Sequence, residues 1–305
     1  MKWVACNLCG SDDAGPLYPS LLSQANNPDR IAHYRCTSAW YRRHYAIVKC
    51  RQCGLVYANP RPPEEEVLNA YREVEDPLYL REELGRVLTF RRHVGAMEEV
   101  MGPPQEGRRL LDVGCYVGLF LEAAKGHGWE AWGVEPCRWA VKEGHRRGLT
   151  ILEGTLREAS LPAESFDVVT FWDVAEHLTN PRATFAEAWR VLKPGGWIII
   201  QTMNIASWTA RLLGSHWPWL MEMHLYYFSP RTLACLLERV GFTPVKTARL
   251  GRYLRLNYLA SRLRSLSPGL AQGLQRALRR FHMAEWPILI NPPDLFTLFA
   301  RKEGS

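Results

Sequence analysis

Hydrophobic and polar positions alternate in a repeating strand–turn–helix pattern from Arg108 onward. Apolar runs of strand length are bounded by turn residues, and the segments between them carry apolar residues at helical spacing. Strands are predicted within RRLLDVG, WEAWGVEP, LTILEG, FDVVTFWD, GGWIIIQT, FTPVKTARL and LFTLFARK. This alternation predicts an α/β, Rossmann-like fold with a seven-stranded, mostly parallel sheet, helices on both faces and a last strand running antiparallel at the edge.

The first hundred residues follow a different pattern and predict two further regions. Residues 1–60 are rich in Cys, Tyr, Arg and turn residues, which predicts a small module that needs a metal. Residues 61–103 carry acids at a helix start and then apolar residues at helical spacing, which predicts a helical linker or lid. The main domain is expected over 104–305, with a basic helical insertion at 252–282.

Four of the eight cysteines form two C-x-x-C pairs, at Cys6, Cys9, Cys50 and Cys53. In a reducing compartment such pairs are typical of metal ligands. Four thiolates complete a tetrahedral zinc site and leave no open position for chemistry, so we expect structural zinc. Competing ligands are His33, Cys36 and His44.

A nucleoside-containing ligand is predicted from the first two strands of the main domain. The first strand ends in the Gly-rich turn DVGCYVG, residues 112–118, and the second ends in Glu135. A carboxylate at that position can accept hydrogen bonds from both hydroxyls of a ribose. The turn lacks G-x-G-x-x-G, and its leading Asp112 suits an ammonium group and would repel a pyrophosphate.

Three segments resemble the class I S-adenosylmethionine-dependent methyltransferases, over roughly residues 108–245: DVGCYVGLFLEAAKGHGWEAWGVEP, ESFDVVTFWDVAEHLTNP and EAWRVLKPGGWIIIQTMN. The resemblance implies S-adenosylmethionine as cofactor. It implies cofactor-binding roles for Asp112, Gly114, Gly118, Glu135, Pro136, Thr155, Leu156, Trp172 and Asp173. Tyr116 departs from the family, which usually has a second glycine there, and tyrosine tolerates a positive φ poorly.

The segment CRQCGLVYANPRP resembles the zinc-binding N-terminal module of bacterial sugar methyltransferases. Sugar C-methyltransferases of that kind carry a longer C-terminal domain that this chain lacks. We therefore expect O-methylation rather than methylation of carbon.

Methyl transfer requires alignment of donor and acceptor and usually removal of a proton from the acceptor. His177, which follows the fourth strand, and His224, within MEMHLYYFSP, are the candidate catalytic residues. His177 can instead orient a loop, and His224 can instead be a packed side chain. Tyr226 and Tyr227 are candidates for the acceptor pocket. A second hypothesis is a divalent metal, since a D/E-x-x-E-H pattern of metal-assisted O-methyltransferases resembles the set Asp173, Glu176, His177 and His224.

Aromatic and basic residues after the fifth strand leave several interpretations open. Trp208, Trp217 and Trp219 are either pocket faces for flat or sugar acceptors or a packed lid. Residues 246–284 hold nine Lys or Arg and no Asp or Glu, although the net charge of the chain is only +7. Leucines and arginines alternate within 252–280, which is typical of peripheral membrane contact, of phosphate contact, or of a helical cover with a solvated face.

The leading hypothesis is an enzyme that methylates a small-molecule or lipid-linked acceptor, first of all a sugar, polysaccharide or natural-product hydroxyl. The alternative is an RNA methyltransferase that binds RNA through the zinc module and the basic segment. A scaffold or cofactor-sensing subunit comes third, and Asp112, Glu135 and Asp173 argue against it. The sequence has no signal peptide and no transmembrane run of about 18 apolar residues, so we expect a cytoplasmic location, with the inner membrane surface as an additional one.

Overall fold

The computed structural model describes residues 1–22, 30–37, 41–263 and 267–304. Parts of the predicted zinc module (23–29 and 38–40) and of the predicted basic insertion (264–266) therefore lie outside the described residues.

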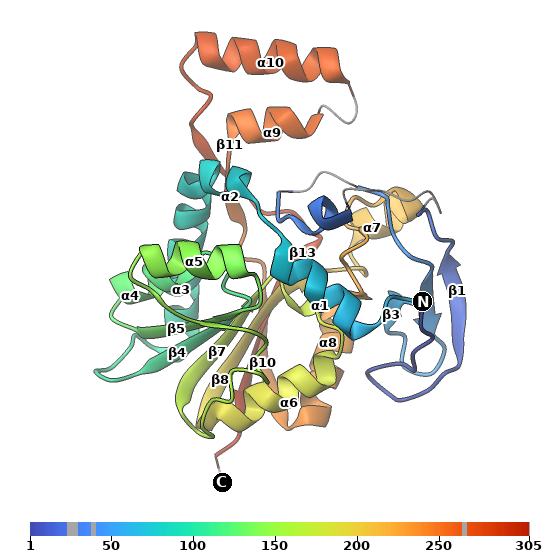
Figure 1. Cartoon of the computed structure of the whole chain (residues 1–305), viewed down its shortest axis with the longest axis vertical. Helices are drawn as coiled ribbons and strands as arrows, with labels where there is room; N and C mark the ends of the chain where they lie inside the picture. Colours follow the sequence, from blue (N-terminus) through green and yellow to red (C-terminus); the bar gives the residue numbers. More distant parts are fainter. Residues whose placement is uncertain (23–29, 38–40, 264–266, 305) are drawn as a thin grey trace.

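A seven-stranded sheet forms the centre of the molecule (Figure 1). Its strands are β4 (Arg109–Val113), β5 (Glu130–Glu135), β6 (Thr150–Glu153), β7 (Phe166–Trp172), β8 (Leu192–Met203), β10 (Phe242–Ala248) and β13 (Leu295–Lys302). Their order is β10-β13-β8-β7-β4-β5-β6, and β13 runs antiparallel to both of its neighbours. The predicted Rossmann-like fold is confirmed. The antiparallel strand β13 lies between β8 and β10, however, so β10 and not β13 forms that edge of the sheet.

Helices cover both faces of this sheet, as the alternating pattern predicts (Figure 1). One face carries α3 (Glu83–Met101), α4 (Leu119–Gly126) and α5 (Arg138–Arg146), and the other carries α6 (Pro181–Val191) and α8 (Pro230–Val240). The central strands are buried on both sides, because their Leu, Val and Ile residues point alternately into two apolar clusters.

A smaller sheet joins the N-terminal module to a distant segment. Its order is β1 (Ala14–Tyr18), β2 (Ile47–Cys50), β3 (Val56–Ala58) and β9 (Tyr226–Tyr227). The β3 and β9 strands pair antiparallel, with Val56 opposite Tyr227 and Tyr57 opposite Tyr226. The module is therefore continuous with the segment that follows β8, which the sequence did not predict.

Short helices connect these sheets around the site. The predicted helical region contains α1 (Glu64–Glu73), α2 (Pro77–Arg81) and the whole of α3. Three 3-10 helices and one α-helix complete this part: η1 (Arg30–Tyr34), η2 (Ala175–His177), α7 (Trp208–Leu213) and η3 (Gly214–His216). Three glutamates in the first turn of α1 favour its start, because they interact with the positive end of the helix dipole.

The basic insertion projects from the rest of the molecule (Figure 1). It is helical over α9 (Leu256–Arg262) and α10 (Pro268–Arg280), as predicted. Its first residues instead form β11 (Arg252–Arg255), which pairs antiparallel with β12 (Pro287–Ile290), a partner too distant in sequence for helical periodicity to reveal. Among the helices that the structure describes, none has the length and apolar character needed to cross a bilayer.

Candidate active site and metal centres

A cavity of about 850 Å³ lies at the carboxyl ends of β4, β5 and β7. Ligands of open α/β sheets bind at this edge. The predicted cofactor residues in its wall are Asp112, Gly114, Glu135, Pro136, Thr155, Leu156, Trp172 and Asp173. Gly118 is not part of the wall; it begins α4 with φ 83°, and a Cβ there would lie 2.3 Å from Cδ1 of Leu149.

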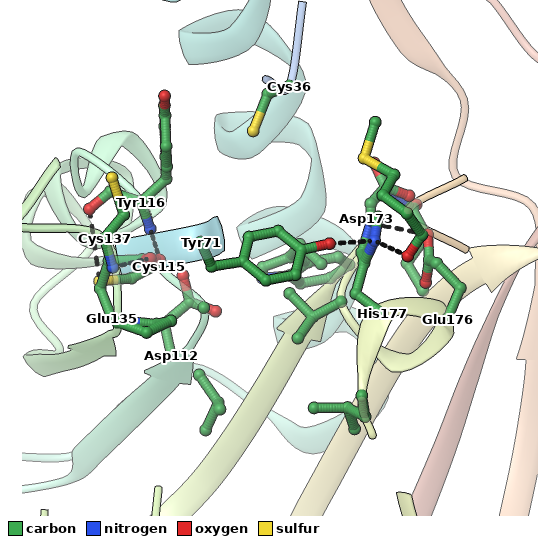
Figure 2. Close-up of a pocket in the computed structure, with 18 of the residues that line it drawn as sticks. Cys36, Tyr71, Asp112, Cys115, Tyr116, Glu135, Cys137, Asp173, Glu176 and His177 are labelled. Atoms are coloured by element: carbon green, nitrogen blue, oxygen red, sulfur yellow. Dashed lines mark hydrogen bonds and ion pairs between the residues drawn. The ribbon is translucent and has the colours of Figure 1, made fainter. Parts of the chain in front are cut away.

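The Glu135 carboxylate is held by two backbone donors at the buried end of β5 (Figure 2). The N–H of Tyr116 donates to Oε2 at 2.8 Å, and the N–H of Cys137 donates to Oε1 at 2.8 Å. Burial raises the pKa of Glu135 to about 7, although both bonds act in the opposite direction. Each oxygen keeps a lone pair, so the group retains the capacity to accept ribose hydroxyls.

Tyr116 adopts the strained conformation that its sequence position predicts, with φ 51°. Two features offset the cost. Its N–H binds Glu135, and its buried ring packs edge-on against Tyr79, with 4.5 Å between centroids. The family's glycine is therefore replaced by a side chain that builds the cavity wall.

Asp112 is fully enclosed next to this position, at the end of β4. The hydroxyl of Thr170 donates to its Oδ1 at 2.7 Å. Burial raises the pKa of Asp112 well above its ordinary value. Within the described residues no cationic side chain pairs with it, so a ligand ammonium or sulfonium group would supply the missing positive charge. Asp112 and Glu135 together fit S-adenosylmethionine.

Arg86 of α3 also lines the cavity and was not predicted. Its guanidinium carbon lies 3.8 Å from the centre of the Tyr79 ring, and its Nε has no hydrogen-bond partner within the described chain. A buried guanidinium with a free donor suits a carboxylate. The only sequence signal is helical: Arg86, Phe90 and His93 lie on the face of α3 that borders the cavity.

Three potential metal ligands line the cavity, and Figure 2 shows two of them, Glu176 and His177, at the opposite end from Asp112 and Glu135. Ligand atoms of Glu176, His177 and His224 all lie within 4.8 Å of one another. Three of the four predicted ligands thus come together. Asp173 does not join them; its carboxylate forms an ion pair with Arg252 at 3.0 Å.

Neighbouring groups orient these three side chains. Nδ1 of His177 lies 3.0 Å from the carbonyl oxygen of Met223, and Nδ1 of His224 lies 2.7 Å from that of Trp219. A carbonyl only accepts, so Nδ1 is the protonated nitrogen of each ring and Nε2 keeps the lone pair. Fixing the ring through its other nitrogen is characteristic of metal-binding histidines.

Two hydroxyl groups also contact the potential metal ligands. The Thr202 hydroxyl donates to Oε2 of Glu176 at 2.7 Å. The Tyr71 hydroxyl, from α1, lies 2.8 Å from Nδ1 of His177 (Figure 2). Tyr71 was missed at the sequence level, because nothing local links α1 to η2.

Burial sets the charge state of the cluster. It raises the pKa of Glu176 to about 8, with the nearby Asp173 carboxylate adding to the effect. It lowers the pKa of His177 to about 4 and that of His224 well below the ordinary range. Neutral imidazoles are weak bases but good metal ligands. The cluster therefore fits a divalent cation better than it fits two catalytic bases.

The segment that carries His224 is fastened to the N-terminal module. The N–H of Ala58, in β3, donates to the carbonyl of Leu225 at 2.9 Å, and the N–H of Leu225 donates to the carbonyl of Glu176 at 2.8 Å. The buried Glu222 carboxylate lies 2.8 Å from Nδ1 of His33. We call residues 217–228 the acceptor loop, and the module forms its outer support.

The four predicted zinc ligands meet in that module. The sulfur atoms of Cys6 and Cys53 lie 3.4 Å apart, and those of Cys9 and Cys50 lie 3.5 Å apart. All four lie within 4.8 Å of one another. A tetrahedral zinc site with Zn–S bonds of about 2.3 Å requires sulfur atoms about 3.8 Å apart, so the cluster fits zinc.

The competing zinc ligands and the predicted pocket aromatics have other roles. His33 pairs with Glu222, His44 binds the carbonyl of Tyr45, and Cys36 lines the cavity. Tyr226 and Tyr227 are buried in β9 and are not part of the cavity wall. Of the three tryptophans, Trp219 lines the cavity, Trp217 is fully buried and Trp208 is exposed.

Comparison with known families bears on this site directly. A family model described as a methyltransferase domain matches residues 84–247, just over half of the chain. The chain belongs to the methyltransferase domain family. The matched span contains the seven-stranded sheet up to β10 together with every residue of the cofactor wall, so the resemblance to class I S-adenosylmethionine-dependent methyltransferases is confirmed.

Two curated relatives are similar to part of this chain. The ubiquinone biosynthesis O-methyltransferase of Cereibacter sphaeroides is 36% identical over 155 residues, which are 47% of this chain and 63% of that protein. The protein of the same name from Thiobacillus denitrificans is 33% identical over 109 residues, covering 33% and 47%. The chain thus spans less than two thirds of the length of each of these two curated relatives.

Solved structures of methyltransferases share the fold. A chain from the complex between the Haloferax volcanii Trm112 methyltransferase activator and a methyltransferase matches with a TM-score of 0.50 and 14% identity. The match covers 70% of this chain and 90% of that one. At this identity the likeness supports the fold of the methyltransferase domain alone.

Proposed function

We propose that this chain transfers the methyl group of S-adenosylmethionine to a hydroxyl of a small-molecule acceptor, and that Glu176, His177 and His224 hold a divalent cation that activates this hydroxyl. The observation that carries the proposal is the position of the three-residue cluster. It lies on the wall of the same cavity as Asp112 and Glu135.

The chain's own residues divide the work. We expect Glu135 to bind the ribose hydroxyls, Asp112 the ammonium of the methionine moiety, and Arg86 its carboxylate. S-adenosylmethionine supplies a methyl group on a sulfonium, ready for in-line displacement. Enclosure of both substrates in one cavity supplies the alignment that such a displacement requires.

Proton removal is assigned to the opposite end. A divalent cation held there by Glu176, His177 and His224 would lower the pKa of a coordinated hydroxyl. Nε2 of His177 lies 3.9 Å from Oε1 of Glu176, and these two atoms, together with Nε2 of His224, are the proposed ligand atoms. The ion pair with Arg252 keeps Asp173 out of this set. The O-methyltransferase relatives support oxygen as the acceptor atom.

For the acceptor we propose the class that the sequence suggests, namely a sugar or natural-product hydroxyl. RNA methylation remains the alternative. Arg252 pairs with Asp173, and Arg255 pairs with Glu82 and Glu285. Part of the basic segment is therefore already neutralised inside the protein, which favours the small-molecule proposal.

The test uses S-adenosylmethionine labelled in its methyl group and a cell extract fractionated into small molecules, lipids, polysaccharide and RNA. We expect label in a fraction that nuclease does not release, lost after EDTA treatment and restored by Mg²⁺ or Mn²⁺, with bound zinc measured throughout. His224→Ala should abolish transfer, whereas His216→Ala, an exposed histidine of the same loop region, should not. Full activity after EDTA with zinc still bound would contradict the metal role.

A further inference from the structure

The outer face of α10 carries an exposed apolar stripe. Leu270, Leu274 and Phe281 are 62%, 39% and 67% exposed. They recur at helical spacing and so lie on one side of the helix. The buried residues Ala271 and Gln275 mark a different side, which faces α9. The stripe is therefore not used in packing the hairpin of α9 and α10.

Arginines occupy other exposed positions around α10: by helical spacing, Arg280 borders the stripe, Arg276 lies farther round the helix and Arg279 lies on the opposite side. Arg276, Arg279 and Arg280 are exposed, and within the ranges that the structure describes none of them pairs with a carboxylate. The sequence from 246 to 284 contains no Asp or Glu at all. A positive field consequently surrounds the apolar stripe, unlike the partly neutralised arginines of β11.

Further apolar side chains are exposed at the other end of this projecting region. Trp286, Ile288 and Leu289, at and near β12, are 57%, 37% and 43% exposed. Figure 1 shows α9 and α10 standing clear of the two sheets, so a flat partner can reach α10 without meeting the rest of the molecule. We call α10 together with residues 281–289 the α10 ridge.

The ridge is also close to the site. Tyr258 and Arg262 of α9 line the cavity, while α10 packs on α9. One layer of helix thus separates the ridge from the cavity wall.

We propose that the α10 ridge docks on the surface of a membrane that contains anionic phospholipids. An amphipathic helix with leucine and phenylalanine on one face and arginine beside it is the pattern that interfacial helices use. Single-stranded RNA would use aromatic stacking platforms, which only Phe281 and Trp286 of the ridge offer, whereas its exposed leucines and isoleucine suit a lipid surface. A second copy of the ridge would bring like charges together. Docking goes beyond the proposed function and does not depend on it.

The test is sedimentation of the full chain with vesicles of phosphatidylcholine, with or without one part in three of phosphatidylglycerol. We expect binding to the anionic vesicles, weakened by salt. Replacing Arg276, Arg279 and Arg280 by Gln should lower the affinity about 100-fold, since each arginine near such a surface contributes about fivefold. Phe281→Ser should lower it about tenfold through lost apolar burial.

The matched control replaces three exposed arginines elsewhere, Arg91, Arg231 and Arg239, by Gln and should leave vesicle binding unchanged. Unchanged S-adenosylmethionine binding by calorimetry confirms that each variant is folded. Equal vesicle binding by both triple variants would overturn the proposal. Absence of binding to the anionic vesicles would overturn it as well. A dimer that Phe281→Ser dissociates, or an RNA oligonucleotide that binds through the ridge arginines, would then identify the partner of this surface.

Discussion

The two ends of the cavity are built in different ways. The cofactor end takes Asp112, Glu135 and Trp172 from the carboxyl ends of adjacent strands, and the register of one sheet fixes their positions. The acceptor end takes Glu176 and His177 from η2 and His224 from the acceptor loop. That loop is held by a strand of the N-terminal module. The comparison teaches that the N-terminal module pairs directly with the loop of the proposed acceptor end, whereas the main sheet alone positions the three residues of the cofactor end.

Among the changes that separate the two ends of the cavity, disruption of the predicted zinc cluster should have the largest effect. Cys53→Ser should lower methyl transfer about 100-fold, the upper end of effects that follow when groups orienting metal ligands are lost. The dissociation constant of S-adenosylmethionine, measured by calorimetry, should change by less than about threefold, because the main sheet remains. Cys235→Ser is the control, a half-buried cysteine outside the cluster.

A substitution of Glu135 should affect the cofactor end of the cavity and leave the proposed metal site intact. Glu135→Gln removes a charged acceptor, and hydrogen bonds to charged groups contribute about 1.5–3 kcal/mol, so cofactor affinity should fall about 10- to 100-fold. Binding of Mn²⁺ to Glu176, His177 and His224, followed by electron paramagnetic resonance, should persist. Loss of both functions in this variant would show that the two ends are not separable.

The pKa of about 7 for Glu135 predicts a pH dependence of cofactor binding. Burial raises this pKa, so the group is protonated below about pH 7, and a cationic, hydroxyl-bearing ligand prefers the carboxylate. Affinity should therefore rise from pH 6 to pH 8, by at most about tenfold per unit. In Glu135→Gln the rise around pH 7 should shrink, and an unchanged profile would assign it to another group.

A smaller effect is expected from Tyr71, which contacts His177. Tyr71→Phe keeps the ring and removes the hydroxyl 2.8 Å from Nδ1. One such hydrogen bond contributes about 1 kcal/mol, so Mn²⁺ affinity and turnover should each fall about fivefold. Cofactor affinity should not move. A change in cofactor affinity alone would place Tyr71 at the other end of the cavity.

More of the cofactor end than of the acceptor end of the cavity could be predicted from the sequence. The strands, Asp112, Glu135 and the four cysteines could be predicted, because each follows from local periodicity or short spacing. Arg86 and Tyr71 could not, because they reach the cavity only through packing of helices remote in sequence. Tyr226 was expected in the acceptor pocket, but its strand pairs with the strand of Tyr57 and Tyr226 is buried there. These two strands are far apart in the sequence, so no local pattern predicts their pairing.

Other predictions depend on chemistry that a fold does not test. The roles of His177 and His224, the ranges 1–60, 61–103 and 104–305, and the cytoplasmic location stay predictions. The strained Tyr116 shows why one departure from a family pattern need not alter a site. Its N–H still reaches Glu135, and its ring gains a partner in Tyr79.

Hydrogen–deuterium exchange before and after release of the thiolate-bound zinc tests the central claim most directly. The measurement compares peptides from the acceptor loop, residues 217–228, with peptides from 109–135. We predict that the acceptor loop loses protection when zinc leaves while β4 and β5 keep theirs. Unchanged protection of the acceptor loop, or equal loss in both regions, would contradict the division between the two ends.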